Sequence, residues 1–320
     1  MTIHFNFLKK KANLSGLCCL YLLPDQFILT RLTRKQNDTP TIMFIERCSY
    51  QSHSLKFLLE TMLKKHGALH ATISWILYFD DYQLLLLDPP AVEPHEMIGA
   101  LRWQIKELIN FPAEDAAIQY FAVPSRLAIK QKIYVAAAST PVLQKTVTLI
   151  QDIGLDLKSI DIPELALRNI NALYGDDQCY LGLLVIHRDH ALLIVTYQKN
   201  LLLSRQLNLP GMLNLDEWAA VAQMATPALW LNNLLAEIQN SFTFCQSQQQ
   251  QDLPTKMLVS TPITALPLYL GRLLHMTVEP LHIEEKLNFE CALPADEYLS
   301  LDYLIAIGGA LRECEHDARN

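Results

Sequence analysis

The tetrapeptide His187-Arg188-Asp189-His190 combines residue types that enzymes use for proton transfer and metal binding. An HRD triplet occurs in the catalytic loop of protein kinases, where an asparagine follows the aspartate with four residues between them. The corresponding residue here is Ile194, and the sequence contains neither the glycine-rich loop nor the DFG motif of kinases. We therefore do not expect a kinase catalytic loop.

The same tetrapeptide has two further interpretations, a metal site and a turn. His187 and His190 could bind a metal ion together, but no neighbouring Cys or Glu completes a set with the spacing of a zinc site. Apolar runs flank the tetrapeptide, LLVI before it and ALLIVTY after it, and both are rich in residues that strands favour. We predict a β-hairpin with the tetrapeptide at its turn.

Composition limits the class of protein. The chain has 320 residues, of which 51% are hydrophobic, and its net charge is -7. This length is sufficient for two domains, or for one large two-lobed domain, with a substantial core. The negative charge and the lack of a dense Lys/Arg stripe argue against nucleic acid as the main ligand, because binding phosphates needs such a basic surface.

The sequence favours a cytoplasmic location. No secretion signal and no uncharged run long enough to span a bilayer is visible, and seven cysteines without framework spacing suit a reducing compartment. We expect most cysteines to pack in the core. The segment Lys9–Lys11, beside Phe5 and Phe7, is locally basic and could contact an anionic membrane surface or remain a frayed terminus.

Two similar segments lie about half a chain apart. Gly16–Leu32 has a glycine, an apolar strand, a short turn and a second apolar strand, and Gly182–Val195 repeats this plan. The repeat is what a duplicated protein would show, with each lobe beginning in a β-hairpin. We place the first lobe at residues 1–177 and the second at 178–320.

Between these hairpins the pattern alternates between strands and helices. Strands are expected in ATISWILYF, YQLLLL, IQYFAV and KIYVAAA. One helix is expected around Met97, Leu101, Ile105 and Leu108, because their spacing places them on one face. Two more are expected, from Thr140 to Gly154 and from Pro163 to about Tyr174.

The second half has its own helices. One is expected from Asp216 to about Met224, and another carries an apolar stripe of Leu231, Leu234, Ile238, Phe242 and Cys245. The run Gln246–Asp252 suggests a polar loop, and KMLVS and MTVEPL suggest strands. The last expected helix contains the pair Gly308-Gly309. Glycine inside a helix lowers its stability, so the pair indicates close packing or the close approach of a ligand.

Several of these segments resemble the PilM family of type IV pilus assembly proteins. They are LRWQIKELINFPAEDAAIQYF, IYVAAASTPVLQ, LIQDIGLDLKSIDIPELALRNI and YLIAIGGALRE, which occur in the family's order between about Gly16 and Arg312. A related cytoplasmic domain occurs in the type II secretion protein GspL, which continues into a transmembrane helix that we do not expect here.

The resemblance implies an α/β protein with an actin-like ATPase fold. In that fold two RNase-H-like lobes flank a nucleotide cleft, and a small α+β domain is inserted in the first lobe, here at about residues 89–155. The first hairpin of such proteins carries an Asp-x-Gly pattern, the second hairpin repeats it, and a later Gly-Gly turn approaches the adenosine. Glycine turns let backbone N–H groups approach the phosphates, and the acidic side chain organises magnesium.

This sequence departs from the family pattern at each of these places. Cys18–Leu20 stands where the first Asp-x-Gly would begin, and Val185–His187 occupies the second hairpin. The adenosine turn corresponds to Val259–Thr264, which lacks glycine. Only Gly308 and Gly309 remain, and helix packing would also explain them.

These departures predict a protein with no catalytic residues and no metal site of its own. Arg188, Gly308 and Gly309 are the candidates for what is left of a nucleotide cleft, so ATP with magnesium is the cofactor to test, although we expect none. The resemblance implies a cytoplasmic scaffold, peripheral to the inner membrane, that docks the tail of a PilN-like single-pass membrane protein and contacts other pilus platform or motor components. Trp103 and Phe111 are the candidate docking residues, with core packing as the alternative for each. The competing hypothesis is an ATP-binding switch or ATPase of pilus assembly or type II secretion.

Overall fold

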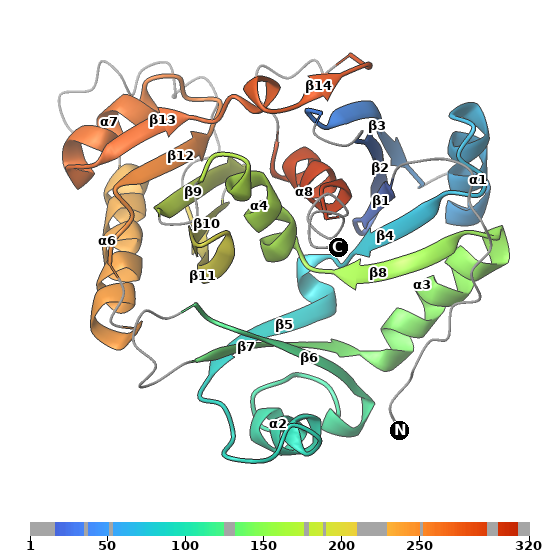
Figure 1. Cartoon of the computed structure of the whole chain (residues 1–320), viewed down its shortest axis with the longest axis horizontal. Coiled ribbons are helices and arrows are strands. Elements are labelled where there is room, and N and C mark those ends of the chain that lie inside the picture. The colour runs from blue at the N-terminus through green and yellow to red at the C-terminus, as the bar shows by residue number, and fades with distance from the viewer. Residues whose placement is uncertain are drawn as a thin grey trace.

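The chain folds around two mixed β-sheets that share one plan (Figure 1). This computed structural model describes residues 17–34, 38–50, 54–124, 132–175, 179–187, 190–209, 229–249, 252–292 and 300–312. The first lobe consists of the six-stranded sheet, with order β14-β3-β2-β1-β4-β8, its helices, and a small sheet inserted between β4 and β8. The second lobe consists of the five-stranded sheet, with order β11-β10-β9-β12-β13, and its helices. In each sheet three consecutive strands pair antiparallel and two later strands continue in parallel on the other side. The duplication predicted from the two hairpins is confirmed.

The first sheet divides its side chains between two apolar clusters. Its strands are β1 (Leu17–Leu22), β2 (Gln26–Thr33), β3 (Thr41–Ser49), β4 (Thr72–Ile76) and β8 (Asp156–Asp161), completed by the short β14 (Asn288–Phe289). Since neighbouring side chains on a strand point to opposite faces, Cys18 and Leu20 pack with α1 (Leu55–Lys65) and α3 (Thr140–Ile153), whereas Cys19 and Tyr21 face the second lobe. The two adjacent cysteines are therefore buried on opposite faces of the sheet.

The second sheet contains the predicted hairpin. Its strands are β9 (Tyr180–His187), β10 (His190–Tyr197), β11 (Asn200–Asn208), β12 (Lys256–Ser260) and β13 (Thr277–Pro280). β9 and β10 pair antiparallel up to His187 and His190, which are Cα partners, so the predicted hairpin pairing is confirmed. Arg188 and Asp189 lie outside the described residues, as does the helix expected from Asp216 to Met224.

One loop predicted in the second lobe is wrong. α6 spans Leu229–Gln249, so most of the glutamine-rich run Gln246–Asp252 continues the helix. Glutamine is a good helix former, and Gln246 and Ser247 point to solvent where their polar groups need no partner. The predicted apolar stripe is confirmed, since all five of its side chains are buried: Leu231, Leu234, Ile238, Phe242 and Cys245.

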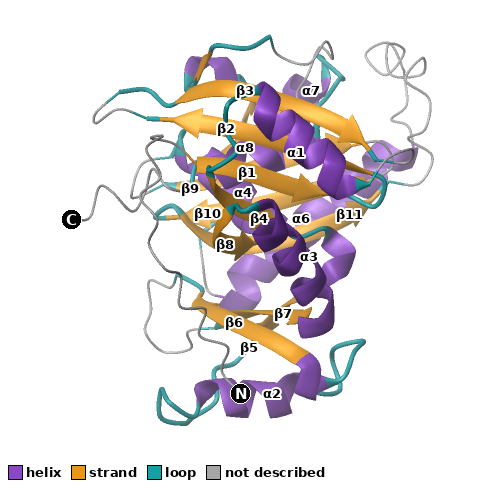
Figure 2. Ribbon diagram, turned by 90° about the vertical axis from the view of Figure 1, so that its right-hand side faces the viewer, coloured by secondary structure: helices purple, strands orange, loops and turns teal. Residues whose placement is uncertain are grey.

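A third, smaller sheet lies at one end of the molecule (Figure 2). Its order is β5 (Tyr82–Leu87), β7 (Ile133–Ser139) and β6 (Ala116–Ala122), and α2 (Met97–Ile105) lies on its outer side. The sheet starts at Tyr82, whereas the resemblance implied an inserted domain from about residue 89, because β5 is an edge strand of the small sheet. Leu101 and Ile105 are buried as predicted, but Leu108 is 49% exposed because α2 ends before it.

Two helices lie between the large sheets (Figure 1). They are α4 (Pro163–Ala172) and α8 (Leu301–Ala310), which pack on each other, and α8 also packs on β1, β2 and β4. The remaining long helix, α7 (Leu266–Leu274), covers β13. In the described part of the chain, every helix is too short or too polar to cross a bilayer.

Candidate functional site

The helix pair α4–α8 explains the Gly308-Gly309 motif. A Cβ atom on Gly308 would lie 2.0 Å from the carbonyl oxygen of Ala166 in α4, and one on Gly309 would lie 2.5 Å from Sγ of Cys19. The Nδ2 group of Asn169 donates a hydrogen bond to the carbonyl of Gly308 at 2.9 Å. Both glycines are thus buried between α4 and β1, and the packing explanation accounts for them.

The strand β1 presents no phosphate-binding chemistry to the space between the lobes. Cys19 and Tyr21 point toward the second lobe and are fully buried in the cluster that includes α8. Burial raises the pKa of the Cys19 thiol, and the nearby Asp161 carboxylate raises it further. Burial likewise raises the pKa of the Tyr21 phenol, with Asp302 adding to the effect. Cys19 lies in the stretch Cys18–Leu20, where the resemblance puts the start of the Asp-x-Gly pattern, and Tyr21 follows that stretch on the same face of β1. Both side chains are neutral, so the residues present do not fit a magnesium-bound triphosphate.

Carbonyl groups in the turn between β1 and β2 accept hydrogen bonds from residues at the end of β3. The hydroxyl of Tyr50 donates to the carbonyl of Leu23, and the backbone N–H of Tyr50 and the hydroxyl of Ser49 both donate to the carbonyl of Asp25. A phosphate is recognised by N–H groups that converge on it, usually from glycine turns. The hydrogen bonds of this turn instead involve its carbonyl groups, which do not bind a phosphate.

The buried polar groups near this space pair with one another. Tyr82, the first residue of β5, donates to the Glu164 carboxyl group of α4, and Arg312 donates to Asp161 at the end of β8. Burial raises the pKa of Glu164 to about 7, with the hydrogen bond from Tyr82 acting in the opposite direction. Burial also raises the pKa of Asp161, and Arg312 opposes it. These pairs connect α4, α8 and the two sheets of the first lobe.

A second ion pair holds the start of α8. Nη2 of Arg47, on β3, donates to Asp302 at 2.9 Å and to the hydroxyl of Ser300 at 3.4 Å, and the guanidinium group lies 4.6 Å from the ring centre of Tyr303. The start of α8 is therefore bonded to β3 through Arg47, and the residues just after α8 are bonded to β8 through Arg312. This role of Arg47 could not be expected from the sequence pattern, because Arg47 lies on a strand that we did not predict.

Two bridges connect the lobes away from the helix pair. The hydroxyl of Tyr134, on β7 of the small sheet, accepts from the backbone N–H of Ser204 at 3.2 Å and donates to the carbonyl of Leu202 at 3.4 Å, both on β11. On the other side, β14 follows the second-lobe strand β13 but pairs with β3 of the first lobe, where Asn288 donates to the carbonyl of Pro40. Hydrogen bonds therefore join the lobes at two separate places.

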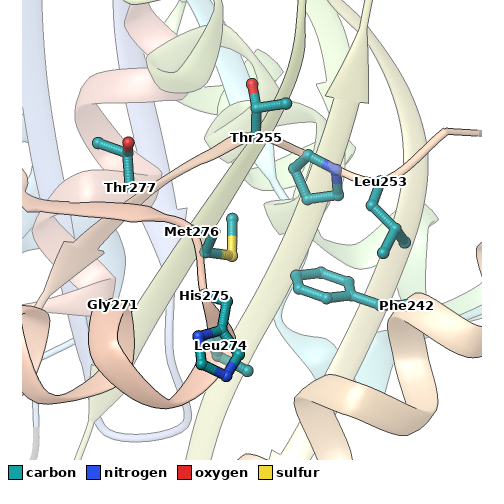
Figure 3. A pocket seen from close by; sticks show the side chains of 9 residues that line it. Phe242, Leu253, Thr255, Gly271, Leu274, His275, Met276 and Thr277 are labelled. Carbon is teal, nitrogen blue, oxygen red and sulfur yellow. The ribbon is translucent and has the colours of Figure 1, made fainter.

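A surface pocket of about 570 Å³ lies in the second lobe beside α6 and α7 (Figure 3). Phe242, Leu253 and Met276 point toward its interior, and His275 and Thr255 lie at its edge. No Lys or Arg is among the described residues that line it. The described chain also contains no group of three or more His, Cys, Asp or Glu side chains placed to hold a metal ion.

The outer face of α2 presents the second candidate site. Trp103 is 78% exposed, which excludes the core-packing alternative for this residue. Phe111 is partly buried and packs against the apolar cluster between α2 and the small sheet, so core packing accounts for most of its ring. Arg102 has a structural role, because its guanidinium donates to the carbonyls of Ala113, Glu114 and Ala116.

Comparison with known proteins bears on the fold. No family model and no curated protein matches this sequence. A solved structure described as the PilM-PilN type IV pilus biogenesis complex is similar over 92% of this chain and 98% of that chain, with a TM-score of 0.67 and 17% identity. The chain has an actin-like fold.

Two other solved structures are similar to this actin-like chain at lower scores. One is the cytoplasmic domain of EpsL, an inner-membrane component of the type II secretion system of Vibrio cholerae, with a TM-score of 0.49, 11% identity and coverage of 93% of this chain and 95% of that chain. The other is a Bacteroides thetaiotaomicron protein with an actin-like ATPase fold and unknown function, with a TM-score of 0.45, 10% identity and coverage of 86% and 93%. The predicted fold class is confirmed by the similarity with the TM-score of 0.67 and by the shared plan of the two large sheets.

Proposed function

We propose that this actin-like chain is a cytoplasmic scaffold of type IV pilus biogenesis, peripheral to the inner membrane, and that it does not hydrolyse ATP. Its partner is the cytoplasmic tail of a PilN-like single-pass membrane protein, as the similarity to a structure described as a PilM-PilN complex suggests. Within the PilM family the quoted segments look most like MshI, the PilM-like component of the mannose-sensitive haemagglutinin (MSHA) pilus, so we assign the scaffold to that type of system.

One observation carries the non-hydrolytic part of this proposal. Cys19 and Tyr21 fill the first-lobe side of the cleft, and the Gly308-Gly309 pair allows α8 to pack directly on β1. A carboxylate that organises magnesium and N–H groups that contact phosphates are both needed for phosphoryl transfer. Because buried neutral side chains replace the carboxylate, the cleft supports interaction between the lobes instead of chemistry on a nucleotide.

Thermal unfolding with and without millimolar Mg-ATP tests this proposal against a nucleotide-binding switch. A ligand present at a hundred times its dissociation constant stabilises the folded state by about 2.7 kcal/mol, which raises the Tm by a few degrees in a chain of this size. We expect a Tm change no larger than that caused by magnesium chloride alone. A larger rise, or release of phosphate above the rate without protein, would show that the chain is a nucleotide switch or ATPase.

Membrane fractionation tests the scaffold itself. In cells with an intact pilus system the chain should sediment with the inner membrane, and deletion of the PilN-like protein should move it to the soluble fraction. Sedimentation that is independent of every pilus membrane protein would contradict the proposed partner.

A further inference from the structure

The outward face of α2 has a composition that folding does not require. Trp103 is the most exposed of the large hydrophobic side chains that the structure describes, and the next, Leu229, is 75% exposed. Leu101 and Ile105 form the buried face of the helix, and Arg102 holds the helix to the following loop. Trp103 therefore points away from the small sheet, and Nζ of Lys106, 5.6 Å from its ring centre, is the cation that lies over it.

Gly99 leaves an opening beside this tryptophan. The two residues are four apart on the helix and therefore lie on the same face. A Cβ atom on Gly99 would meet nothing within 4 Å, in contrast to Gly308, so no packing within the chain requires glycine there. Glycine inside a helix costs about 1 kcal/mol relative to alanine. A close approach by another molecule at this point would explain both the missing side chain and the exposed ring.

Acidic side chains flank the same helix. Glu96 immediately precedes α2, and Glu107 lies in the turn that follows it. Both are exposed, so an acidic side chain lies beside each end of the helix that carries Gly99 and Trp103. Residues 88–115 contain six Asp or Glu and two Lys or Arg, which gives a charge of -4. An anionic lipid surface would be repelled by this charge, whereas a basic protein segment would be attracted.

We propose that the surface formed by Glu96, Gly99, Trp103 and Glu107 docks a basic cytoplasmic segment of an inner-membrane protein, with an apolar residue on Trp103 and Lys or Arg on both sides of it. The inference rests on the proposed function, which places the chain at the inner membrane. Cytoplasmic segments next to membrane spans are enriched in Lys and Arg, and this matches the acidic surface. Glu96 and Glu107 flank α2, whose nine residues extend about 14 Å along the helix axis. An extended segment covers that distance in about four to five residues, so its two basic residues should have roughly that spacing.

Site-specific photocrosslinking in cells that carry the pilus system identifies the occupant. The full chain would carry p-benzoylphenylalanine in place of Trp103, and a control chain would carry it in place of Phe57, which is 56% exposed on α1 of the first lobe. We expect a product specific to position 103, in which mass spectrometry places the crosslink in a cytoplasmic segment of a membrane protein with Lys or Arg on both sides. A crosslink to residues 1–16 of the chain itself, to a soluble protein, or to a segment without basic residues would overturn the proposal.

Fluorescence anisotropy with a synthetic peptide of the crosslinked segment measures the contribution of each group. Trp103→Ala and the double variant Glu96→Lys/Glu107→Lys should each weaken binding by the full-length chain at least tenfold, and Phe57→Ala should leave it unchanged. Binding by the original chain should also weaken as salt rises from about 0.05 to 0.3 M, because exposed charges are screened. A change of less than twofold in both α2 variants would overturn the assignment.

Membrane fractionation separates failure of this site from failure of the scaffold. If the chain still sediments with the inner membrane but position 103 gives no specific crosslink, the α2 proposal is wrong and the proposed function stands. If the chain does not sediment with the membrane in cells with the intact pilus system, the proposed function itself is wrong.

Discussion

Gly308 and Gly99 are both helical glycines, but their surroundings predict opposite effects of the same substitution. Gly308→Ala would place a Cβ atom 2.0 Å from a backbone oxygen that cannot rotate away, so we expect a loss of about 3 kcal/mol or more in the free energy of unfolding. Gly99→Ala adds a methyl group in open space and should stabilise the chain by up to about 1 kcal/mol. Urea denaturation of the two variants measures both values, and equal effects would contradict the packing role of Gly308.

Glu164 should make stability depend on pH. Its pKa rises from an ordinary value of 4.5 to about 7 in the folded state, so between these values the folded chain binds a proton that the unfolded chain has lost. The stabilisation is fully present below pH 4.5 and is lost as pH rises through 7. Glu164→Gln keeps an oxygen for Tyr82 but does not titrate, so its stability relative to the original chain should rise by on the order of 3 kcal/mol between pH 4 and pH 8. Urea denaturation at both pH values checks this, and a constant difference would show that folding does not raise the pKa of Glu164.

Residue types alone could identify some of these roles and not others. The tetrapeptide His187–His190 was predictable as a turn because its neighbours have strand composition over several residues. For Gly308 the sequence left packing and ligand contact open, since both need a missing side chain, and only the position of Ala166 distinguishes them. The sequence left both docking and core packing possible for Trp103, because the helical period identifies a buried face only approximately. The contacts of Arg102 with three carbonyl groups could not be predicted from the sequence either.

At the scale of elements, the hydroxyl of Tyr134 joins the small sheet to the second lobe. β11 is an edge strand, so the outward N–H of Ser204 has no strand partner and bonds to Tyr134 instead. Tyr134→Phe keeps the ring and removes this acceptor, at a cost of about 1 kcal/mol. We expect the protection of the Ser204 amide in hydrogen exchange to fall about fivefold.

Tyr120→Phe is the matched control for this prediction, because Tyr120 lies on β6 of the same sheet with its side chain exposed. Tyr120→Phe should leave the hydrogen-exchange protection of the Ser204 amide unchanged. Similar exchange at Ser204 in the original chain and in Tyr134→Phe would mean that other contacts hold the small sheet against β11.

Elements were predictable where local patterns are strong. The helices beginning at Thr140 and Pro163 follow from proline at the first turn, and Gly154 ends the first of them in a left-handed conformation. The end of α6 was predicted wrongly, because a run of glutamines is compatible with either a loop or a helix. β14 could not be expected, since two residues have no period and are a strand only because β3 is beside them.

At the scale of the whole molecule, one apolar cluster includes residues of both large sheets. Tyr21 and Ile28 of the first lobe share it with Leu183 and Leu193 of the second, and α4 and α8 contribute from between them. We therefore expect the two lobes to unfold together. Calorimetry should show a single transition whose calorimetric and van't Hoff enthalpies agree, whereas two resolved transitions would mean that the lobes are independent.

The position of α8 also has a consequence for biosynthesis. The apolar face of β1, with Cys19 and Tyr21, is covered by a helix that begins at Leu301, near the other end of the chain. At a translation rate of about 5 to 20 residues per second, roughly 15 to 60 s separate the synthesis of these two elements. During that interval the nascent first sheet exposes the part of its apolar surface that α8 covers in the native state. A ribosome that stalls before residue 300 should therefore release a product that chaperones retain or proteases remove, even though most of both lobes has already been made.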